Sequence, residues 1–116
     1  MKIGKRGAIG DYVMTTQEQR FNLAMNNIYS EANAIGYTAK YFLQMLHQHG
    51  GLSTAKILIN AATASYGYTK LFKMGRLDLT VEALVYENSE WHTLFAPDEL
   101  KKCRHRLIES GYIQPW

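Results

Sequence analysis

The side chains best suited to bind a metal ion or to react are four histidines and one cysteine, in a chain of 116 residues. His47 and His49 lie two positions apart, so on one helix their side chains would point about 200° apart and could not share a metal ion. Cys103 and His105 have the same spacing, and His92 stands alone. Metal sites need clustered His, Cys or carboxylate groups. The sequence therefore predicts no metal site and no cofactor.

Catalytic patterns are also missing from the sequence. It has no phosphate-binding loop, dinucleotide fingerprint, zinc-protease motif or nucleophile elbow. Cys103 falls on the apolar stripe of a predicted helix, which favours a buried, inert thiol over a nucleophile. The adjacent carboxylates Asp98 and Glu99 are explained by a helix start. We expect a protein that is not an enzyme, although a site assembled from distant residues stays open.

The charged residues Arg76, Asp78 and Glu82 have two interpretations. They could form a cluster that meets a ligand or partner at a helix N-terminus. They could also form a capping turn, in which Asp78 binds free amides and Arg76 pairs with Asp78 or Glu82. We favour the capping turn because it already explains these residue types.

The densest basic run lies near the C-terminus. Leu100, Cys103 and Leu107 are expected to face the core, so the cations would cover most of the exposed circumference of this helix. Several cations along one helix can contact successive phosphates. A basic N-terminal arm would add to this surface. The expected nucleic-acid-binding residues are Lys2, Lys5, Arg6, Lys101, Lys102, Arg104 and Arg106.

Aromatic residues are plentiful, with 8 Tyr, 4 Phe and 2 Trp. Helical periodicity places Phe21, Phe42, Phe72, Trp91 and Phe95 in the core. It does not force Tyr29, Tyr37, Tyr66, Tyr86 or Trp116 inward. Exposed aromatic residues near arginine are typical of binding surfaces. The expected partner-binding residues are Tyr66, Arg76, Tyr86 and Trp116.

Length and composition indicate one globular domain. Hydrophobic residues make up 47% and charged residues 20%, and the formal net charge is +3. This mild positive charge permits nucleic-acid binding without requiring it. A single cysteine excludes an internal disulfide and favours the reducing cytoplasm. No apolar run is long enough for a membrane span, and residues 1–14 lack the apolar stretch of a signal peptide.

Hydrophobic periodicity divides the chain into a flexible basic arm, 1–14, and a helical domain, 15–116. Thr15 and Glu18 have the spacing of a capping box at the start of the first helix. Later helices are expected over about 37–49, 53–61, 65–74, 81–87 and 97–110, with a short helical turn at 90–95. Gly36, Gly50–Gly51, Gly75 and Gly111 mark helix ends.

The predicted fold is all-α, a compact bundle of five or six short helices. The short helix pairs around Gly50–Gly51 and Gly75 resemble a helix-turn-helix. Tyr41, Phe42, Met45 and Leu46 share one helical face. The expected core comprises Phe42, Leu46, Leu58, Leu71, Leu84, Leu94, Leu100 and Leu107.

The stretch from Tyr41 to Tyr112 resembles a small bacterial helical domain. Its most specific part is the run Gly-Arg-Leu-Asp-Leu-Thr-Val-Glu at 75–82, followed by Trp91, Leu94–Phe95 and Arg106–Leu107. The resemblance implies a structural unit that occurs in bacteria or phage near mobile elements and DNA-restriction or defence functions. It implies no activity and no catalytic residue.

Two functions remain as hypotheses from the sequence. The first is a non-enzymatic nucleic-acid-binding module, for DNA rather than RNA. The second is a protein-interaction module, either an adaptor or an inhibitor that acts on a bacterial defence or restriction system. A homodimer formed through a spare apolar helix face would fit either hypothesis.

Overall fold

The computed structural model describes residues 13–116, and all regular elements in this range are helical. The all-α prediction is therefore confirmed. The expected arm residues Lys2, Lys5 and Arg6 lie outside the described residues. The helices in chain order are α1 (Thr16–Ala34), α2 (Lys40–Asn60), α3 (Tyr66–Lys73), the 3-10 helix η1 (Leu77–Leu79), α4 (Val81–Glu87), the 3-10 helix η2 (Ser89–Leu94) and α5 (Pro97–Glu109).

Helix α1 begins as its sequence predicts. The Thr15 hydroxyl accepts from the Glu18 N–H at 3.0 Å, and the Glu18 carboxylate accepts from the Thr15 N–H at 2.9 Å. This capping box satisfies amides that have no partner within the helix. The apolar residues at steps of three and four form the buried face, namely Phe21, Met25, Ile28 and Ala32.

The two helices expected around Gly50–Gly51 are the two halves of α2, which bends at Gly50. The φ angle of Gly50 is +78°, a conformation that favours glycine. At Gly51 the backbone comes so close to α1 that its N–H donates to Asn22 Oδ1 at 2.9 Å. Helix α2 begins at Lys40 and not at Tyr37 as expected. Residues 37–39 belong to the connection between α1 and α2.

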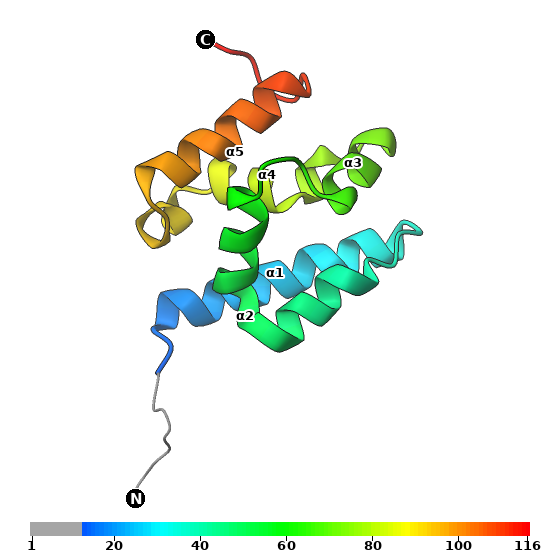
Figure 1. Ribbon diagram of the computed structural model, residues 1–116. Coiled ribbons are helices and arrows are strands. Elements are labelled where there is room, and N and C mark those ends of the chain that lie inside the picture. Colours follow the sequence, from blue (N-terminus) through cyan, green and yellow to red (C-terminus); the bar gives the residue numbers. More distant parts are fainter. Residues whose placement is uncertain (1–12) are drawn as a thin grey trace, which may run out of the picture.

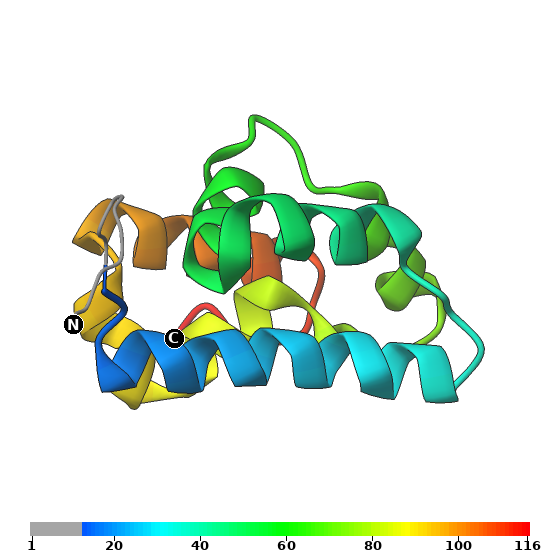
Figure 2. The same cartoon turned by 90° about the horizontal axis from the view of Figure 1, so that it is seen from below.

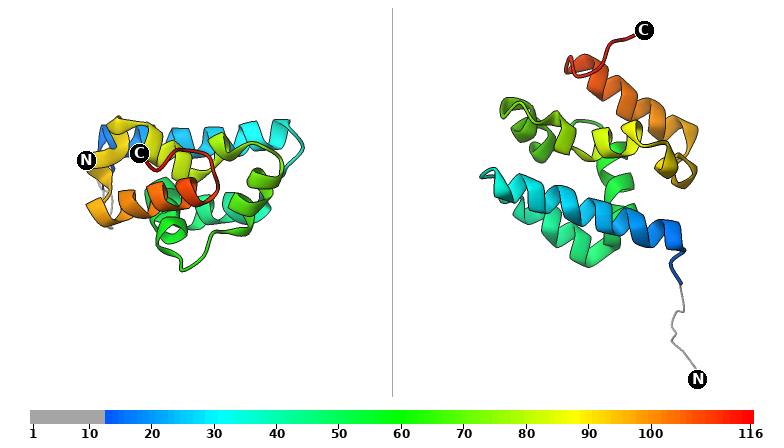
Figure 3. Two further views of the ribbon diagram at one scale, coloured as in Figure 1. Left: turned by 90° about the horizontal axis from the view of Figure 1, so that it is seen from above. Right: turned by 180° about the vertical axis from the view of Figure 1, so that it is seen from behind.

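The helices pack in three levels. Helix α1 and the first half of α2 lie antiparallel, side by side (Figures 1 and 2). Helix α4 is short and central, and α5 lies on its far side from α1 (Figures 1 and 3). Helix α3 sits near the connection between α1 and α2, so that end of the molecule is closed by only a short helix. No helix within residues 13–116 is long and apolar enough to cross a membrane.

Phe21 is fully buried in the main core, the hydrophobic cluster that also contains Met25, Ile28, Leu46, Ala55, Ile59, Val81, Val85, Trp91, Phe95 and Cys103. Its ring meets Trp91 and Phe95 edge-on, with centroids 5.2 and 5.6 Å apart, an arrangement that aromatic rings prefer. Of the expected core residues, Leu46, Leu71 and Leu107 are buried. The prediction for Phe72 is wrong, because its side chain is 50% exposed on the outer side of α3. The other expected residues are partly buried against the main core: Phe42, Leu58, Leu84, Leu94 and Leu100.

The contact between Gly51 and α1 predicts that Gly51→Ala destabilises the fold. A Cβ atom there would lie 2.9 Å from both Asn22 Cα and Asn22 Oδ1, so the two helices would have to separate. We expect the free energy of unfolding to fall by about 1–3 kcal/mol, as for other overpacked sites. Urea denaturation measures the change. Ser53→Ala, an exposed change on the same half of α2, is the control, and equal stability of the two variants would contradict this packing.

Candidate functional site

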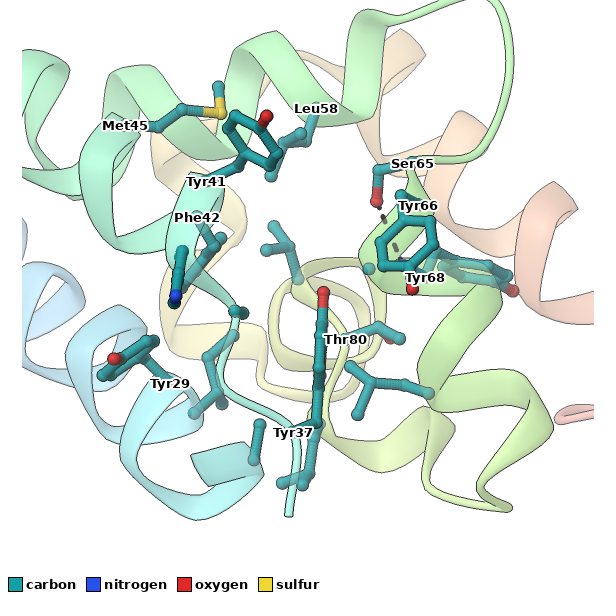
Figure 4. Close-up of a pocket in the computed structure, with 18 of the residues that line it drawn as sticks. Tyr29, Tyr37, Tyr41, Phe42, Met45, Leu58, Ser65, Tyr66, Tyr68 and Thr80 are labelled. Carbon is teal, nitrogen blue, oxygen red and sulfur yellow. Dashed lines mark hydrogen bonds between the residues drawn. The ribbon is translucent and has the colours of Figure 1, made fainter. Parts of the chain in front are cut away.

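An apolar pocket of about 640 Å³ opens between α1, α2 and α3. It lies where the end of α1, the start of α2 and the start of α3 meet, with η1 and α4 behind (Figure 4). This volume is typical of ligand-binding pockets, which are mostly apolar and carry a few polar groups. Its apolar lining includes Ile28, Ala32, Ala39, Phe42, Met45, Leu58, Leu71, Leu79 and Val81.

Five tyrosines surround the pocket: Tyr29, Tyr37, Tyr41, Tyr66 and Tyr68 (Figure 4). Tyr37 and Tyr66 meet edge-on, with ring centroids 6.4 Å apart. Burial raises the pKa of the Tyr37 hydroxyl, and the neighbouring Tyr66 adds to the rise. Tyr41 and Tyr66 are 83% and 74% exposed, so the mouth of the pocket has two large aromatic surfaces open to solvent.

A buried ion pair supports the pocket from behind. Glu82, which lines the pocket, pairs with Arg106 at 2.8 Å. The Arg106 guanidinium also donates to the backbone oxygens of Leu58 at 3.1 Å and Ala61 at 2.6 Å. Burial raises the pKa of the Glu82 carboxyl, and the adjacent guanidinium opposes that rise. Arg106 thus joins α5 to α4 and to the end of α2.

This arrangement corrects the expectation that Arg106 is exposed for phosphate contacts. Only 14% of its side chain is accessible, because its donors are occupied inside the protein. The expected pairing of Arg76 with Asp78 is confirmed, with two hydrogen bonds of 2.9 and 3.0 Å. Arg76 is bonded to Asp78 rather than to Glu82. Thr80, rather than Asp78, accepts from an α4 amide, the Ala83 N–H.

The other basic residues of α5 lie along a separate groove, between α5 and residues 60–64. Lys101, Lys102, Arg104 and His105 line it together with Arg106 and the carboxylates Asp98 and Glu109. Lys102 is 3.3 Å from Asp98 and also donates to Asn60 at 2.9 Å. Arg104 donates to the Pro115 carbonyl.

The four expected partner-binding residues do not come together. Tyr66 lines the apolar pocket, whereas Arg76, Tyr86 and Trp116 do not. Tyr86 is half-buried against the main core, and Trp116 is 91% exposed at the C-terminal end. Of these four, Tyr66 is the residue that joins a larger site.

Tyr66 is the only described lining residue of the pocket that was predicted from the sequence as a binding residue. The others were not, among them Tyr41, Ala39 and Gly67. Tyr41 follows the apolar pattern of α2, which predicts burial, but no helix covers it. The small side chains of Ala32 and Ala39, and the bare backbone of Gly67, leave space that larger residues would fill. The signal in the sequence is a clustering of tyrosines near two helix boundaries: Tyr29, Tyr37 and Tyr41 around Gly36, and Tyr66 and Tyr68 directly after Ser65.

The reactive groups elsewhere show no catalytic arrangement within the described residues. Cys103 is fully buried, as its apolar stripe predicted, and burial raises the pKa of its thiol to about 12. It is therefore protonated at neutral pH and a poor nucleophile. Within residues 13–116, no three His, Cys, Asp or Glu side chains are grouped to hold a metal ion.

Comparisons with protein-family models, with curated proteins and with solved structures found no match to this chain. Its function is therefore inferred from the geometry of its own residues.

The buried pair predicts that Arg106→Met lowers stability by about 3–5 kcal/mol at neutral pH, because it leaves the Glu82 carboxylate buried without a partner. Loss of the guanidinium raises the pKa of Glu82 further, so folding favours its protonated form. The variant is then most stable below the ordinary pKa of Glu, about 4.3, and loses stability as the pH rises through the raised value.

Urea denaturation at acidic and neutral pH tests this prediction. The deficit relative to the wild type should shrink at acidic pH. The control is the double variant Glu82→Gln with Arg106→Met, which has no carboxyl at this site. Relative to this control, the single variant should lose stability as the pH rises from acidic to neutral. A deficit of equal size at both pH values in the single variant would contradict a buried, charged Glu82.

Proposed function

We propose that this protein is a non-catalytic interaction module that binds a segment of a partner protein in the tyrosine-rimmed pocket. The observation that carries the proposal is the combination of an apolar interior with exposed aromatic side chains at its mouth. Protein interfaces concentrate their binding energy in a few buried anchors, often Tyr or Trp, that pack in well-formed pockets. The pocket would receive one bulky apolar side chain of the partner.

The exposure of Tyr41 and Tyr66 favours a protein segment over a small molecule. A ligand held inside the pocket would leave both outer ring surfaces in water. A polypeptide that crosses the mouth would cover both rings while it placed an apolar side chain between them. Tyrosine gives such contacts a large area at a low cost in conformational entropy.

One substitution at Gly67 can reduce the space inside the pocket. A Cβ atom on Gly67 would lie 3.3 Å from Tyr37 Oη, so a longer side chain there would project into the pocket. Gly67 lies inside α3 without a positive φ, and leucine favours helices more than glycine does. Thr69→Leu adds the same side chain to an exposed position of α3 outside the pocket and serves as the matched control.

The first experiment selects a phage-displayed random peptide library on the wild type, Gly67→Leu and Thr69→Leu. We expect the wild type and Thr69→Leu to enrich peptides that share a bulky apolar residue, and Gly67→Leu to lose them. Tyr66→Ala should weaken the binding of the selected peptides about tenfold. This is the effect of losing an interface anchor that contributes about 1.4 kcal/mol. Phe72→Ala, which removes an exposed ring on the same helix but outside the pocket, should not.

A second probe separates a protein ligand from a small one. N-phenylnaphthylamine, a neutral dye that fluoresces in apolar surroundings, should enter the pocket of the wild type and be excluded from Gly67→Leu. If the dye binds in this way but no peptide is enriched, the pocket holds a small molecule and the proposal for a partner protein is wrong.

A second candidate function is nucleic-acid binding along the groove beside α5. The observation that favours it is that basic side chains outnumber carboxylates in the lining of this groove: Lys101, Lys102, Arg104, His105 and Arg106 against Asp98 and Glu109. The Arg106 guanidinium is already paired with Glu82, so the phosphate contacts would come from the other basic side chains. Contacts to phosphates alone would make such binding strongly dependent on salt.

Charge reversal tests this candidate without disturbing the core. Lys101→Glu combined with Lys102→Glu should weaken binding to labelled duplex DNA and reduce the slope of log affinity against log salt by about 0.9 for each phosphate that the protein no longer neutralises. Fluorescence anisotropy measures both, and RNA in parallel tests the preference for DNA. The control reverses Lys70 and Lys73 on α3. If both pairs of substitutions have the same effect, the groove is not a specific site.

A further inference from the structure

Besides its tyrosines, the pocket has two ionisable groups among its described lining residues, Lys40 and Glu82. Glu82 is buried and its charge is balanced by Arg106 at 2.8 Å. Lys40 is exposed in the first turn of α2, and no carboxylate within residues 13–116 forms an ion pair with it. The charge that this pocket presents to an incoming ligand is therefore a single positive one.

We propose that the pocket recognises an acidic segment, in which a carboxylate lies next to the bulky apolar side chain and faces Lys40. This inference rests on the proposed function and names the partner more closely. An apolar interior with one cation at its edge is complementary to an amphiphile with one anion. A basic segment would place its charge against Lys40 and would be rejected.

The start of α2 strengthens this preference. Residues 39–42 line the pocket, and the N-terminus of α2 is among them. Ala39 provides no capping side chain, and the first turn of α2 has no acidic residue. The positive end of the helix dipole therefore adds to the charge of Lys40.

The tyrosines around the pocket also suggest the opposite preference, a positively charged partner segment. Aromatic cages bind cations such as methylated lysine through the faces of their rings. In this pocket Lys40 opposes a cation, and the one carboxylate in the lining is already neutralised by Arg106. We therefore favour the anion, and selection of basic or methylated peptides would overturn the inference.

The test repeats the peptide selection on Lys40→Glu and Lys40→Gln. Peptides selected by the wild type should carry Asp or Glu beside the apolar anchor. Those selected by Lys40→Glu should carry Lys or Arg there, and those selected by Lys40→Gln should show no charge preference. Lys73→Glu, an exposed change on α3 outside the pocket, should leave the acidic preference unchanged.

The size of the effect is measured with two dyes of the same ring system. Lys40→Gln should lower the affinity for anilinonaphthalene sulfonate, an anionic dye, by roughly two- to fivefold. This is the contribution of an exposed ion pair. The neutral N-phenylnaphthylamine should bind both proteins equally. Equal weakening of both dyes would show that Lys40 acts on the shape of the pocket and would overturn the inference.

The outcomes separate the two proposals. Peptides with an apolar anchor but no acidic neighbour would leave the interaction module intact and overturn only the preference for a carboxylate. Failure of the wild type to enrich any peptide that Gly67→Leu excludes would overturn both.

Discussion

The contact between Glu82 and Arg106 holds together the parts of the chain on which the rest of the structure depends. A charge buried without a partner is very costly, so α4 and α5 must pack with these two side chains facing each other. The orientation of the Arg106 guanidinium is fixed further, because it also donates to the carbonyl oxygens of Leu58 and Ala61. The end of α2 is thereby fixed against α5, and the connection to α3 begins from a defined place.

The bend at Gly50 complements that constraint. The first half of α2 lies along α1, while the second half turns toward α5 and reaches Arg106. The pocket takes residues from both halves, Phe42 and Met45 from the first and Leu58 from the second. Protein interiors are close-packed and leave few voids. A pocket of about 640 Å³ persists here because Ala32, Ala39 and Gly67 are too small to fill the space.

Local features were the most predictable from the sequence. The capping box of α1 and the break at Gly50–Gly51 depend on a few neighbouring residues, and both are found. The surroundings of Arg106 and Tyr41 were not predictable, because they depend on which helices lie opposite them. Arg106 stands at the border of the apolar stripe of α5, where a buried carboxylate decides its orientation. Tyr41 follows an apolar pattern, but the structure places it at the open mouth of a pocket.

The two candidate surfaces share one side chain. Tyr68 lines both the apolar pocket and the groove beside α5. Its hydroxyl donates to the Arg106 carbonyl at 2.9 Å and lies 2.8 Å from Ser110 Oγ. Substitution of Tyr68 or Arg106 would disturb both surfaces at once, and a binding defect in such a variant could not be assigned to either. The functions of the two surfaces are separated through residues that belong to one of them, such as Tyr66 and Lys40 at the pocket and Lys101 at the groove.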